Sequence, residues 1–278
     1  MIQAFLAKMV ITLCSIVHFF ETNRAFHLFC NTFGKVLNQF LKKYRENFFN
    51  KYYWMVKILS IEGNIGSGKS TLVRILKEKY PNIVFLQEPV DEWMSITDKK
   101  GENILEKFYK DQKKYAFPFQ LMAYISRIAQ LQRTNADLII CERCVLTDRH
   151  VFAQMLYDKG MMEKIHWEIY NKWFDHFNIR IDGHIYIKTF PSTCQKRIIE
   201  RKREGERIEL TYLENCNAYH DKWLQDKKNV LELDGELSFH EEEEIVEGWV
   251  KRIDSFIGDI RTCEKIPAPF ETWKEILW

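Results

Sequence analysis

The chain has 278 residues, a formal net charge of +2 and a hydrophobic content of 46%. This composition excludes a largely disordered protein, and the near-balanced charge provides no global basic field for binding nucleic acid. The seven cysteines are scattered and odd in number, which is typical of a reduced compartment rather than of a disulfide framework. A chain of this length predicts one α/β domain with appendages.

Residues 1–54 differ from the rest of the chain because they are rich in phenylalanine and poor in acids. Met9–Phe20 is apolar but too short to span a bilayer comfortably, so we expect no stable membrane insertion. Three interpretations remain open: a mitochondrial presequence, a helical extension, or a segment upstream of a true start at Met55. We favour the last, which predicts a cytoplasmic protein, whereas a presequence predicts a mitochondrial one.

A glycine-rich loop lies between a predicted strand at Lys57–Ile61 and a predicted helix at Thr71–Lys79. It fits the phosphate-loop pattern G-x-x-x-x-G-K-[ST], in which backbone N–H groups surround phosphate oxygens. The lysine reaches the outer phosphates, and the serine after it can ligate Mg²⁺. The loop therefore predicts binding of a nucleoside triphosphate with Mg²⁺. Its residues are Gly63, Asn64, Ile65, Gly66, Ser67, Gly68, Lys69, Ser70 and Thr71.

Two further predicted strands, Asn82–Gln87 and Asp137–Cys141, are each followed by a glutamate. These are Glu88 and Glu142, and they fall at the carboxyl edge of a parallel sheet, where ligands bind. Glu142 stands where phosphate-loop enzymes place a carboxylate associated with Mg²⁺, and the neighbouring Arg143 can neutralise phosphoryl charge. Taken alone, Glu88 also fits a solvated loop glutamate.

Two helices are predicted at Asn103–Lys114 and Pro118–Arg133, the second beginning at its proline because proline suits the first helical position. On the second helix, Gln120, Ala123 and Arg127 share one face and could read the edge of a planar ligand. An exposed polar stripe explains the same spacing and is the more common case.

The second half of the chain continues the alternation of strands and helices. Strands are predicted at Asp182–Lys188 and Asn229–Leu233, and helices at His150–Tyr157, Met161–Phe177 and Glu241–Ile260. The aromatic residues of the second of these helices indicate core or a subunit interface.

Two cysteines near the third predicted strand and a basic stretch after the fourth each allow more than one interpretation. Cys141 and Cys144 form a lone C-x-x-C without a second pair, so we interpret them as a core and a loop residue rather than as zinc ligands. Arginines crowd the stretch Gln195–Arg207. This stretch fits a solvated basic helix, an RNA-binding patch, or a mobile segment that closes over a triphosphate.

Taken together, the motifs resemble the deoxyribonucleoside kinase family over about Met55–Phe239. The resemblance rests on the order and spacing of GNIGSGKST at Gly63–Thr71, EPV at Glu88–Val90, FPFQ…SR at Phe117–Arg127, ERC…DR…F at Glu142–Phe152, RIIERKREGE at Arg197–Glu206, TYLE at Thr211–Glu214 and LDG…F at Leu233–Phe239. It implies a P-loop NTPase-type three-layer α/β fold, with a five-stranded parallel sheet flanked by helices and an arginine-rich lid. It also implies a homodimer.

The activity that this resemblance implies is ATP- and Mg²⁺-dependent phosphorylation of a deoxyribonucleoside at its 5′-hydroxyl. A thymidylate-type nucleoside monophosphate kinase is the alternative. The kinase domain would span residues 55–262, between an N-terminal extension at 1–54 and a C-terminal tail at 263–278. No nucleic-acid partner is expected.

The family pattern also assigns roles to individual residues. Glu88 resembles the general base, and Ser70 with Glu142 resembles the Mg²⁺ ligands. Catalytic cations are expected at Lys69, Arg143, Arg197, Arg201 and Arg203. Substrate contacts are expected from Glu88, Trp93, Tyr109, Gln120, Arg127, Arg143, Asp148, Phe152 and Glu206, and Asp234 opens the loop beside the ATP adenine.

The chain departs from the family pattern in two places. Cys144 replaces the usual serine after Glu-Arg, and the link after the lid is one residue short, which makes Glu204 the alternative to Glu206. The combination of Ala123, Arg127 and Asp148 resembles the deoxycytidine and deoxypurine members. We therefore expect a preference for deoxycytidine, deoxyadenosine or deoxyguanosine over thymidine.

Overall fold

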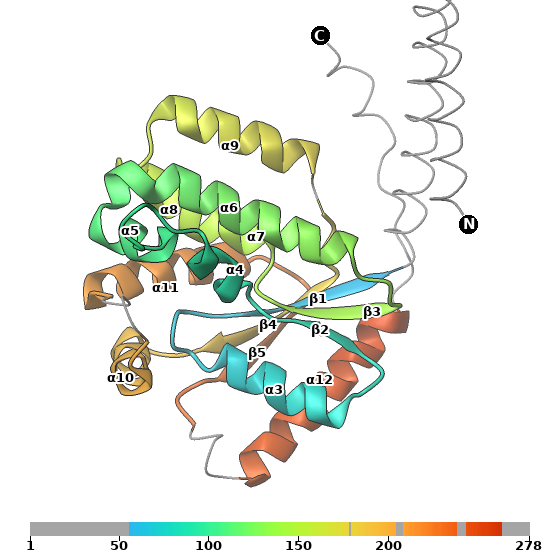
Figure 1. Ribbon diagram of the computed structural model, residues 1–278. Coiled ribbons are helices and arrows are strands. Elements are labelled where there is room, and N and C mark those ends of the chain that lie inside the picture. The colour runs from blue at the N-terminus through green and yellow to red at the C-terminus, as the bar shows by residue number, and fades with distance from the viewer. Residues whose placement is uncertain (1–55, 178, 204–207, 238–242, 263–278) are drawn as a thin grey trace, which may run out of the picture. The chain divides into compact units, whose positions relative to one another are not determined.

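A computed structural model of the chain describes residues 56–177, 179–203, 208–237 and 243–262. Five parallel strands form a single sheet in the order β2-β3-β1-β4-β5 (Figure 1). The strands are β1 at Lys57–Glu62, β2 at Val84–Leu86, β3 at Leu138–Glu142, β4 at Gly183–Lys188 and β5 at Val230–Asp234. The α/β class and the five-stranded parallel sheet expected from the sequence are thus confirmed.

The connections after β1 and β3 leave these adjacent strands in opposite directions, because β2 lies on one side of the pair and β4 on the other. Such a switch in strand order opens a crevice at the carboxyl ends of the two strands. The glycine loop follows β1 and Glu142-Arg143 closes β3. The topology alone therefore places both motifs at one crevice.

Helices cover both faces of the sheet (Figure 1). On one face lie α3 at Lys69–Lys79 and α12 at Glu243–Thr262. The other face carries α6 at Gln112–Gln132, α7 at Val145–Thr147, the π-helix η1 at Asp148–Ala153, α8 at Gln154–Asp158 and α11 at Leu210–Leu224. The shorter α4 at Val90–Ser95 and α5 at Ile104–Lys110 precede α6, and α9 at Lys164–His176 and α10 at Pro191–Arg201 complete the set.

The central strand β1 shows how the two faces differ. Leu59 and Ile61 are fully buried in the apolar core beneath α3 and α12. Burying an aliphatic side chain of this size contributes about 1.5–3 kcal/mol to stability. The alternate residues Ser60 and Glu62 are also fully buried, but on the opposite face, because successive side chains of a strand point to opposite sides. A polar layer therefore lies under the second group of helices.

The expected start of the long helix at Pro118 is wrong. The helix α6 begins at Gln112, where Asp111 caps it by accepting a hydrogen bond from the Lys114 N–H, and Pro118 lies inside the helix. Proline removes one backbone hydrogen bond there. Nine buried residues along the helix offset that loss: Ala116, Phe119, Gln120, Ala123, Tyr124, Ser126, Arg127, Ile128 and Leu131.

The predicted extension at 1–54, the predicted tail at 263–278, Glu204 and Glu206 all lie outside the described residues. Within the described residues, no helix combines the length and the apolar character needed to cross a bilayer.

Candidate active site

The loop after β1 folds as a cradle that depends on glycine. Gly63, Gly66 and Gly68 all have positive φ, and a Cβ added to Gly66 would lie 2.5 Å from the backbone oxygen of Cys194. Because side chains are excluded there, the backbone can approach a bound anion closely. The buried Ser67 Oγ has no hydrogen-bond partner among the described residues. These features fit a phosphate-binding loop at the positive end of α3.

Lys69 lies buried inside this loop, where its Nζ donates a hydrogen bond to the Asn64 backbone oxygen at 2.7 Å. Burial and the nearby Arg143 lower the pKa of Lys69 to about 8. The ammonium group therefore stays largely charged at neutral pH, pointed along the loop rather than into solvent. This is the position from which a lysine can reach the outer phosphates of a nucleotide.

Glu88 follows β2 and is held by two arginines. Its Oε1 accepts a hydrogen bond from Arg127 Nη2 at 2.6 Å, and Arg143 Nη1 lies 2.8 and 2.9 Å from its two oxygens. Burial alone would raise the pKa of Glu88, but Arg143 and Arg127 lower it to about 2. The alternative of a solvated loop glutamate is wrong, since both guanidinium groups are buried.

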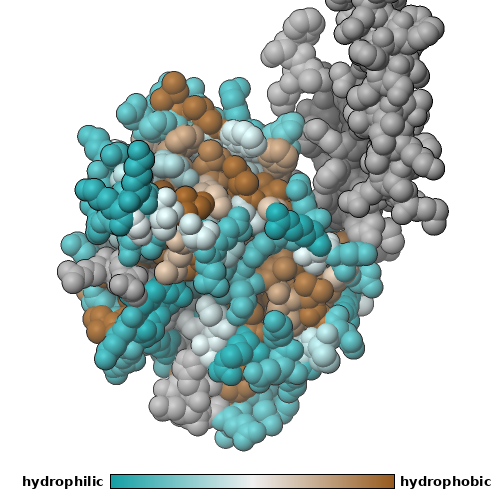
Figure 2. Space-filling model, viewed as in Figure 1, coloured by the Kyte–Doolittle hydropathy of each residue, from teal (hydrophilic) through white to brown (hydrophobic). Residues whose placement is uncertain are grey.

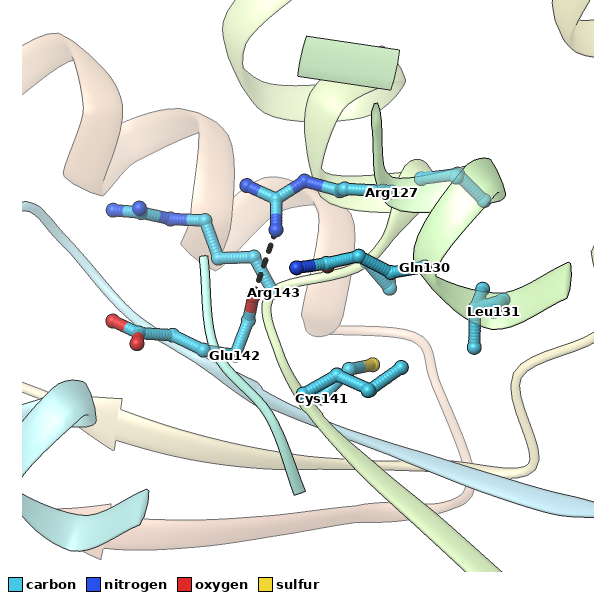
Figure 3. A pocket seen from close by; sticks show the side chains of 9 residues that line it. Arg127, Gln130, Leu131, Cys141, Glu142 and Arg143 are labelled. Carbon is cyan, nitrogen blue, oxygen red and sulfur yellow. Dashed lines mark hydrogen bonds between the residues drawn. The ribbon is translucent and has the colours of Figure 1, made fainter. Parts of the chain in front are cut away.

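Glu142 closes β3 beside the glycine loop. Its Oε1 accepts a hydrogen bond from the Ser70 hydroxyl at 2.7 Å, and its backbone oxygen accepts one from Arg127 Nη1 at 2.8 Å. Figure 3 shows the Glu142 side chain extending away from Arg127, with the Arg143 side chain between them. A hydroxyl and a carboxylate oxygen in contact form the hard-oxygen donor set that Mg²⁺ prefers. These two residues therefore fit a magnesium site at the carboxyl edge of the sheet.

Arg127 donates hydrogen bonds to two carboxylates and one backbone oxygen from different parts of the chain. Besides Glu88 and the Glu142 backbone, its Nε lies 2.9 and 3.1 Å from the two carboxylate oxygens of Asp148 at the start of η1. Burial raises the pKa of Asp148 to about 6, although Arg127 opposes this shift. Gln120, two turns earlier on the same face of α6, is 2% exposed, and its Oε1 has no hydrogen-bond partner among the described residues. The exposed polar stripe considered for this face of α6 is therefore wrong.

Aromatic side chains surround these polar groups. Trp93 is buried, donates from Nε1 to Ser126 Oγ at 2.9 Å, and lies 5.7 Å beneath the Arg127 guanidinium. The Arg143 guanidinium lies 5.0 Å from the ring centre of Phe152. Apolar walls with a few aimed polar groups are typical of small-molecule sites.

The basic helix α10 lies next to the glycine loop. Arg197 Nη1 approaches the Ser67 backbone oxygen at 3.5 Å, whereas Arg201 and Arg203 are exposed at and beyond the end of the helix. Tyr109 packs at the edge of the small core beneath α10, around Cys194. The structure thus brings Arg197 to the phosphate loop and leaves the other two arginines on the surface.

A family model described as deoxynucleoside kinase matches residues 59–258. A probable deoxycytidine kinase of Fowlpox virus is 37% identical over 219 residues, covering 73% of this chain and 89% of the relative. A deoxycytidine kinase of Rattus norvegicus is 34% identical over 241 residues, covering 73% and 92%. A mitochondrial deoxyguanosine kinase of Xenopus laevis is 33% identical over 197 residues, covering 62% and 74%.

The chain belongs to the deoxynucleoside kinase family. The family resemblance expected from the motifs is therefore confirmed, and with it the P-loop kinase fold. The comparisons give no support to a thymidylate-type kinase.

In this deoxynucleoside kinase, most of the expected site residues lie around one crevice. Glu88, Arg127, Arg143 and Asp148 form a continuous set of ion pairs, and Ser70 with Glu142 joins that set to the glycine loop. Asp234 lies apart from these groups at the end of β5, where its carboxylate accepts a hydrogen bond from the Glu236 N–H.

Sequence reasoning missed a buried polar cluster next to the crevice of this kinase. Glu62 is fully buried and accepts hydrogen bonds from Cys144 Sγ at 3.2 Å and from Thr147 Oγ1 at 2.7 Å. Cys144 lies outside the regular elements, as expected for a loop residue, but it is buried and forms the N-cap of α7. The available signal was a glutamate directly after the predicted strand Lys57–Ile61, just before the glycine loop.

Proposed function

We propose that this deoxynucleoside kinase transfers a phosphoryl group from ATP to the 5′-hydroxyl of a deoxyribonucleoside. The observation that carries the proposal is the position of Glu88. An ionised carboxylate, fixed by Arg127 and Arg143, lies at the same crevice as the phosphate loop. Binding a nucleotide alone has no need for a carboxylate there, whereas phosphorylation of a hydroxyl needs an acceptor for its proton.

Glu88 acts on the acceptor and the cations act on the donor. A carboxylate with a low pKa orients the 5′-hydroxyl and takes its proton as the new P–O bond forms. Lys69 and Arg143 stabilise the negative charge of the transferring group, and the Arg143 Nε has no hydrogen-bond partner among the described residues. Arg197, Arg201 and Arg203 belong to a lid that adds charge and excludes water. Mg²⁺, held by Ser70 and Glu142, supplies further charge neutralisation when bound.

The acceptor base lies against α6 in this proposal. Gln120 offers an amide oxygen that accepts no hydrogen bond from the described part of the chain, and the Arg127–Asp148 pair offers donors and an acceptor to a base that carries an amino group. Trp93 and Phe152 wall the base, and Tyr109 with Glu206 binds the sugar 3′-hydroxyl. Asp234 belongs to the loop beside the ATP adenine. The names of the similar kinases support a preference for deoxycytidine or deoxypurines over thymidine.

A substrate panel tests the reaction class and the preference together. With ATP and Mg²⁺, we expect phosphorylation of deoxycytidine, deoxyadenosine or deoxyguanosine with a kcat/KM about tenfold or more above that for thymidine, the effect of one mismatched polar contact. The measurement is transfer of labelled phosphate to each nucleoside and to each monophosphate. Turnover of monophosphates alone would move the protein to the thymidylate-type class, and thymidine as best substrate would contradict the base assignment.

The raised pKa of Asp148 predicts that this activity falls at acidic pH. Since its pKa is raised to about 6, protonation below that pH weakens its pairing with Arg127 in the free enzyme. We expect kcat/KM for the nucleoside to fall as pH drops from 7 to 5, because kcat/KM reports groups of the free enzyme.

Asp148→Asn should remove most of this pH dependence and lower kcat/KM already at pH 7. An unchanged acid limit in the variant would contradict the assignment.

The raised pKa of Asp148 affects stability in the opposite direction to activity: low pH weakens activity but favours the folded state. The folded state holds this proton more tightly than the unfolded state, so the contribution of Asp148 to the free energy of unfolding falls as pH rises from about 4 to about 6.

We also propose that the kinase domain spans residues 55–262 and forms a homodimer. The support for a dimer is an apolar stripe on α9, where Ile165, Ile169 and Trp173 recur every four residues and are 61%, 38% and 41% exposed. Figure 2 shows apolar colouring on this upper part of the molecule. A cytoplasmic location follows if residues 1–54 precede the true start, and a mitochondrial one if they are a presequence.

A further inference from the structure

Arg143 has an unusual backbone conformation for a residue whose side chain must pair with a particular carboxylate. Its φ is +59°, in the left-handed region that favours glycine, yet its side chain is buried and must meet Glu88. A non-glycine residue keeps such a conformation only where its surroundings impose it. The groups that hold the neighbouring backbone therefore decide where the guanidinium lies.

Two anchors hold this turn against β1. The Arg143 N–H donates a hydrogen bond to the Ile61 backbone oxygen at 2.9 Å. One residue further, Cys144 donates from Sγ to Glu62 Oε1 at 3.2 Å, and its N–H donates to Thr147 Oγ1 at 3.2 Å. The Thr147 hydroxyl in turn donates to Glu62 Oε2 at 2.7 Å. Both oxygens of one carboxylate thus bind the two ends of the Cys144–Thr147 turn.

The carboxylate of Glu62 is suited to this task because it is fixed and charged. It is fully buried, and although burial would raise its pKa, the nearby His184 and the hydrogen bond from Thr147 lower that pKa to about 2. His184 Nδ1 lies 3.9 Å from Glu62 Oε1 and 2.8 Å from the Ser60 hydroxyl. Hydrogen bonds to an ionised acceptor are stronger than neutral ones, so the carboxylate is a firm anchor.

We propose that Glu62 is a positioning residue for phosphoryl transfer. Through Cys144 and Thr147 it fixes the turn that holds Arg143 against Glu88. Among the described residues, the Glu62 carboxylate contacts Cys144, Thr147 and His184 rather than Glu88, Lys69 or Ser70, so its influence runs through the backbone of that turn. The inference rests on the proposed kinase reaction, in which Arg143 stabilises the transferring group.

A metal site is the competing explanation of the same cluster. Ligand atoms of Glu62, Cys144 and His184 lie within 4.8 Å of one another, and all three residues are buried. However, the thiol already donates to the carboxylate and the imidazole already pairs with Ser60, so each group has a hydrogen-bond partner without an ion. Burial also raises the pKa of the Cys144 thiol well above its usual value, which disfavours the thiolate that zinc requires.

The test compares three single variants of the full chain with the wild type. Cys144→Ala removes the donor to Glu62 and should lower kcat about tenfold, the size of one lost hydrogen bond, with both KM values changed less than twofold. Cys144→Ser keeps a donor and should restore kcat to at least the wild-type value. Glu62→Gln places an amide against a thiol and a hydroxyl and should lower kcat on the order of 10- to 100-fold.

The matched control is Cys216→Ala, which removes a fully buried sulfur on α11 that packs against Met155. It should keep kcat while losing a similar amount of thermal stability. A crystal structure of Glu62→Gln provides a readout that does not depend on turnover, and should show the Arg143 guanidinium displaced from Glu88.

The outcomes separate the two proposals. A wild-type protein that phosphorylates no nucleoside defeats the kinase reaction, and the crystal structure then still decides whether Glu62 positions Arg143. Wild-type turnover with unchanged kcat in folded Cys144→Ala and Glu62→Gln, or an unmoved Arg143, overturns the positioning role alone. One zinc ion per chain in the purified protein would also overturn it, because Sγ would then be a ligand and not a donor.

Discussion

Replacing Glu88 by glutamine is expected to lower kcat by about 10²- to 10⁴-fold, the usual contribution of a positioned general base. Glutamine has nearly the same shape but cannot accept the proton of the 5′-hydroxyl. The carboxylate is a weak base at rest, because Arg143 and Arg127 lower its pKa to about 2. Its contribution therefore arises as the hydroxyl becomes acidic during bond formation, and appears in kcat more than in KM.

The experiment compares steady-state turnover at saturating ATP and deoxynucleoside with that of Glu92→Gln, an exposed glutamate on α4. The control should match the wild type. Thermal stability should fall in Glu88→Gln and stay constant in the control, since only Glu88 balances two buried guanidinium groups. Turnover within twofold of wild type in a folded Glu88→Gln protein would remove Glu88 from the chemical step.

Replacing Lys69 by methionine is expected to lower kcat by about 10²- to 10³-fold, as does removal of one preorganised charge in other sites that stabilise developing negative charge. Methionine keeps much of the length of the side chain and removes its charge. The Nζ of Lys69 is fixed at 2.7 Å from the Asn64 backbone oxygen, so little reorganisation separates it from a bound phosphate. The loss should appear with every acceptor nucleoside alike, because the lysine acts on the donor.

Lys77→Met is the matched control, because Lys77 lies exposed on the same helix, α3. A pH series adds a second check. With a pKa lowered to about 8, free Lys69 loses its proton as pH rises, so kcat/KM for ATP should fall above pH 8 in the wild type and not in Lys69→Met. Equal activity of the two methionine variants would show that the loop binds nucleotide without using its lysine in the reaction.

The sheet and the strand-end residues follow from short-range patterns. Both ends of each of the five strands lie within two residues of the predicted ends. Buried parallel strands can be predicted in this way because they are short apolar runs between turn residues. The parallel arrangement then brings Glu88 and Glu142 to one edge without any knowledge of packing. These two carboxylates, together with the glycine loop, are the part of the site that local sequence specifies.

The rest depends on contacts that no local pattern contains. Helix α11 went unpredicted because cysteine and histidine occupy its buried face, at Cys216 and His220, and weaken the apolar period. Arg127 has the spacing of a surface residue, and its burial follows from the way α6 packs across the sheet. From the spacing alone an exposed polar stripe was the more common case, and only the family pattern favoured a binding face.

The central place of β1 in the sheet affects how the chain folds during synthesis. The Ile58 N–H binds the Asp182 side chain across 124 residues, and β1 pairs with β3 on one side and β4 on the other. At about 5–20 residues per second, translation leaves the edge of β1 that pairs with β4 without its backbone hydrogen-bond partners for roughly 6–25 s. The nucleotide loop that follows β1 cannot be fixed before those later strands arrive. Nucleotide binding therefore reports that β1 has paired on both sides, and a pulse-labelled nascent chain should acquire it only after β4 has emerged.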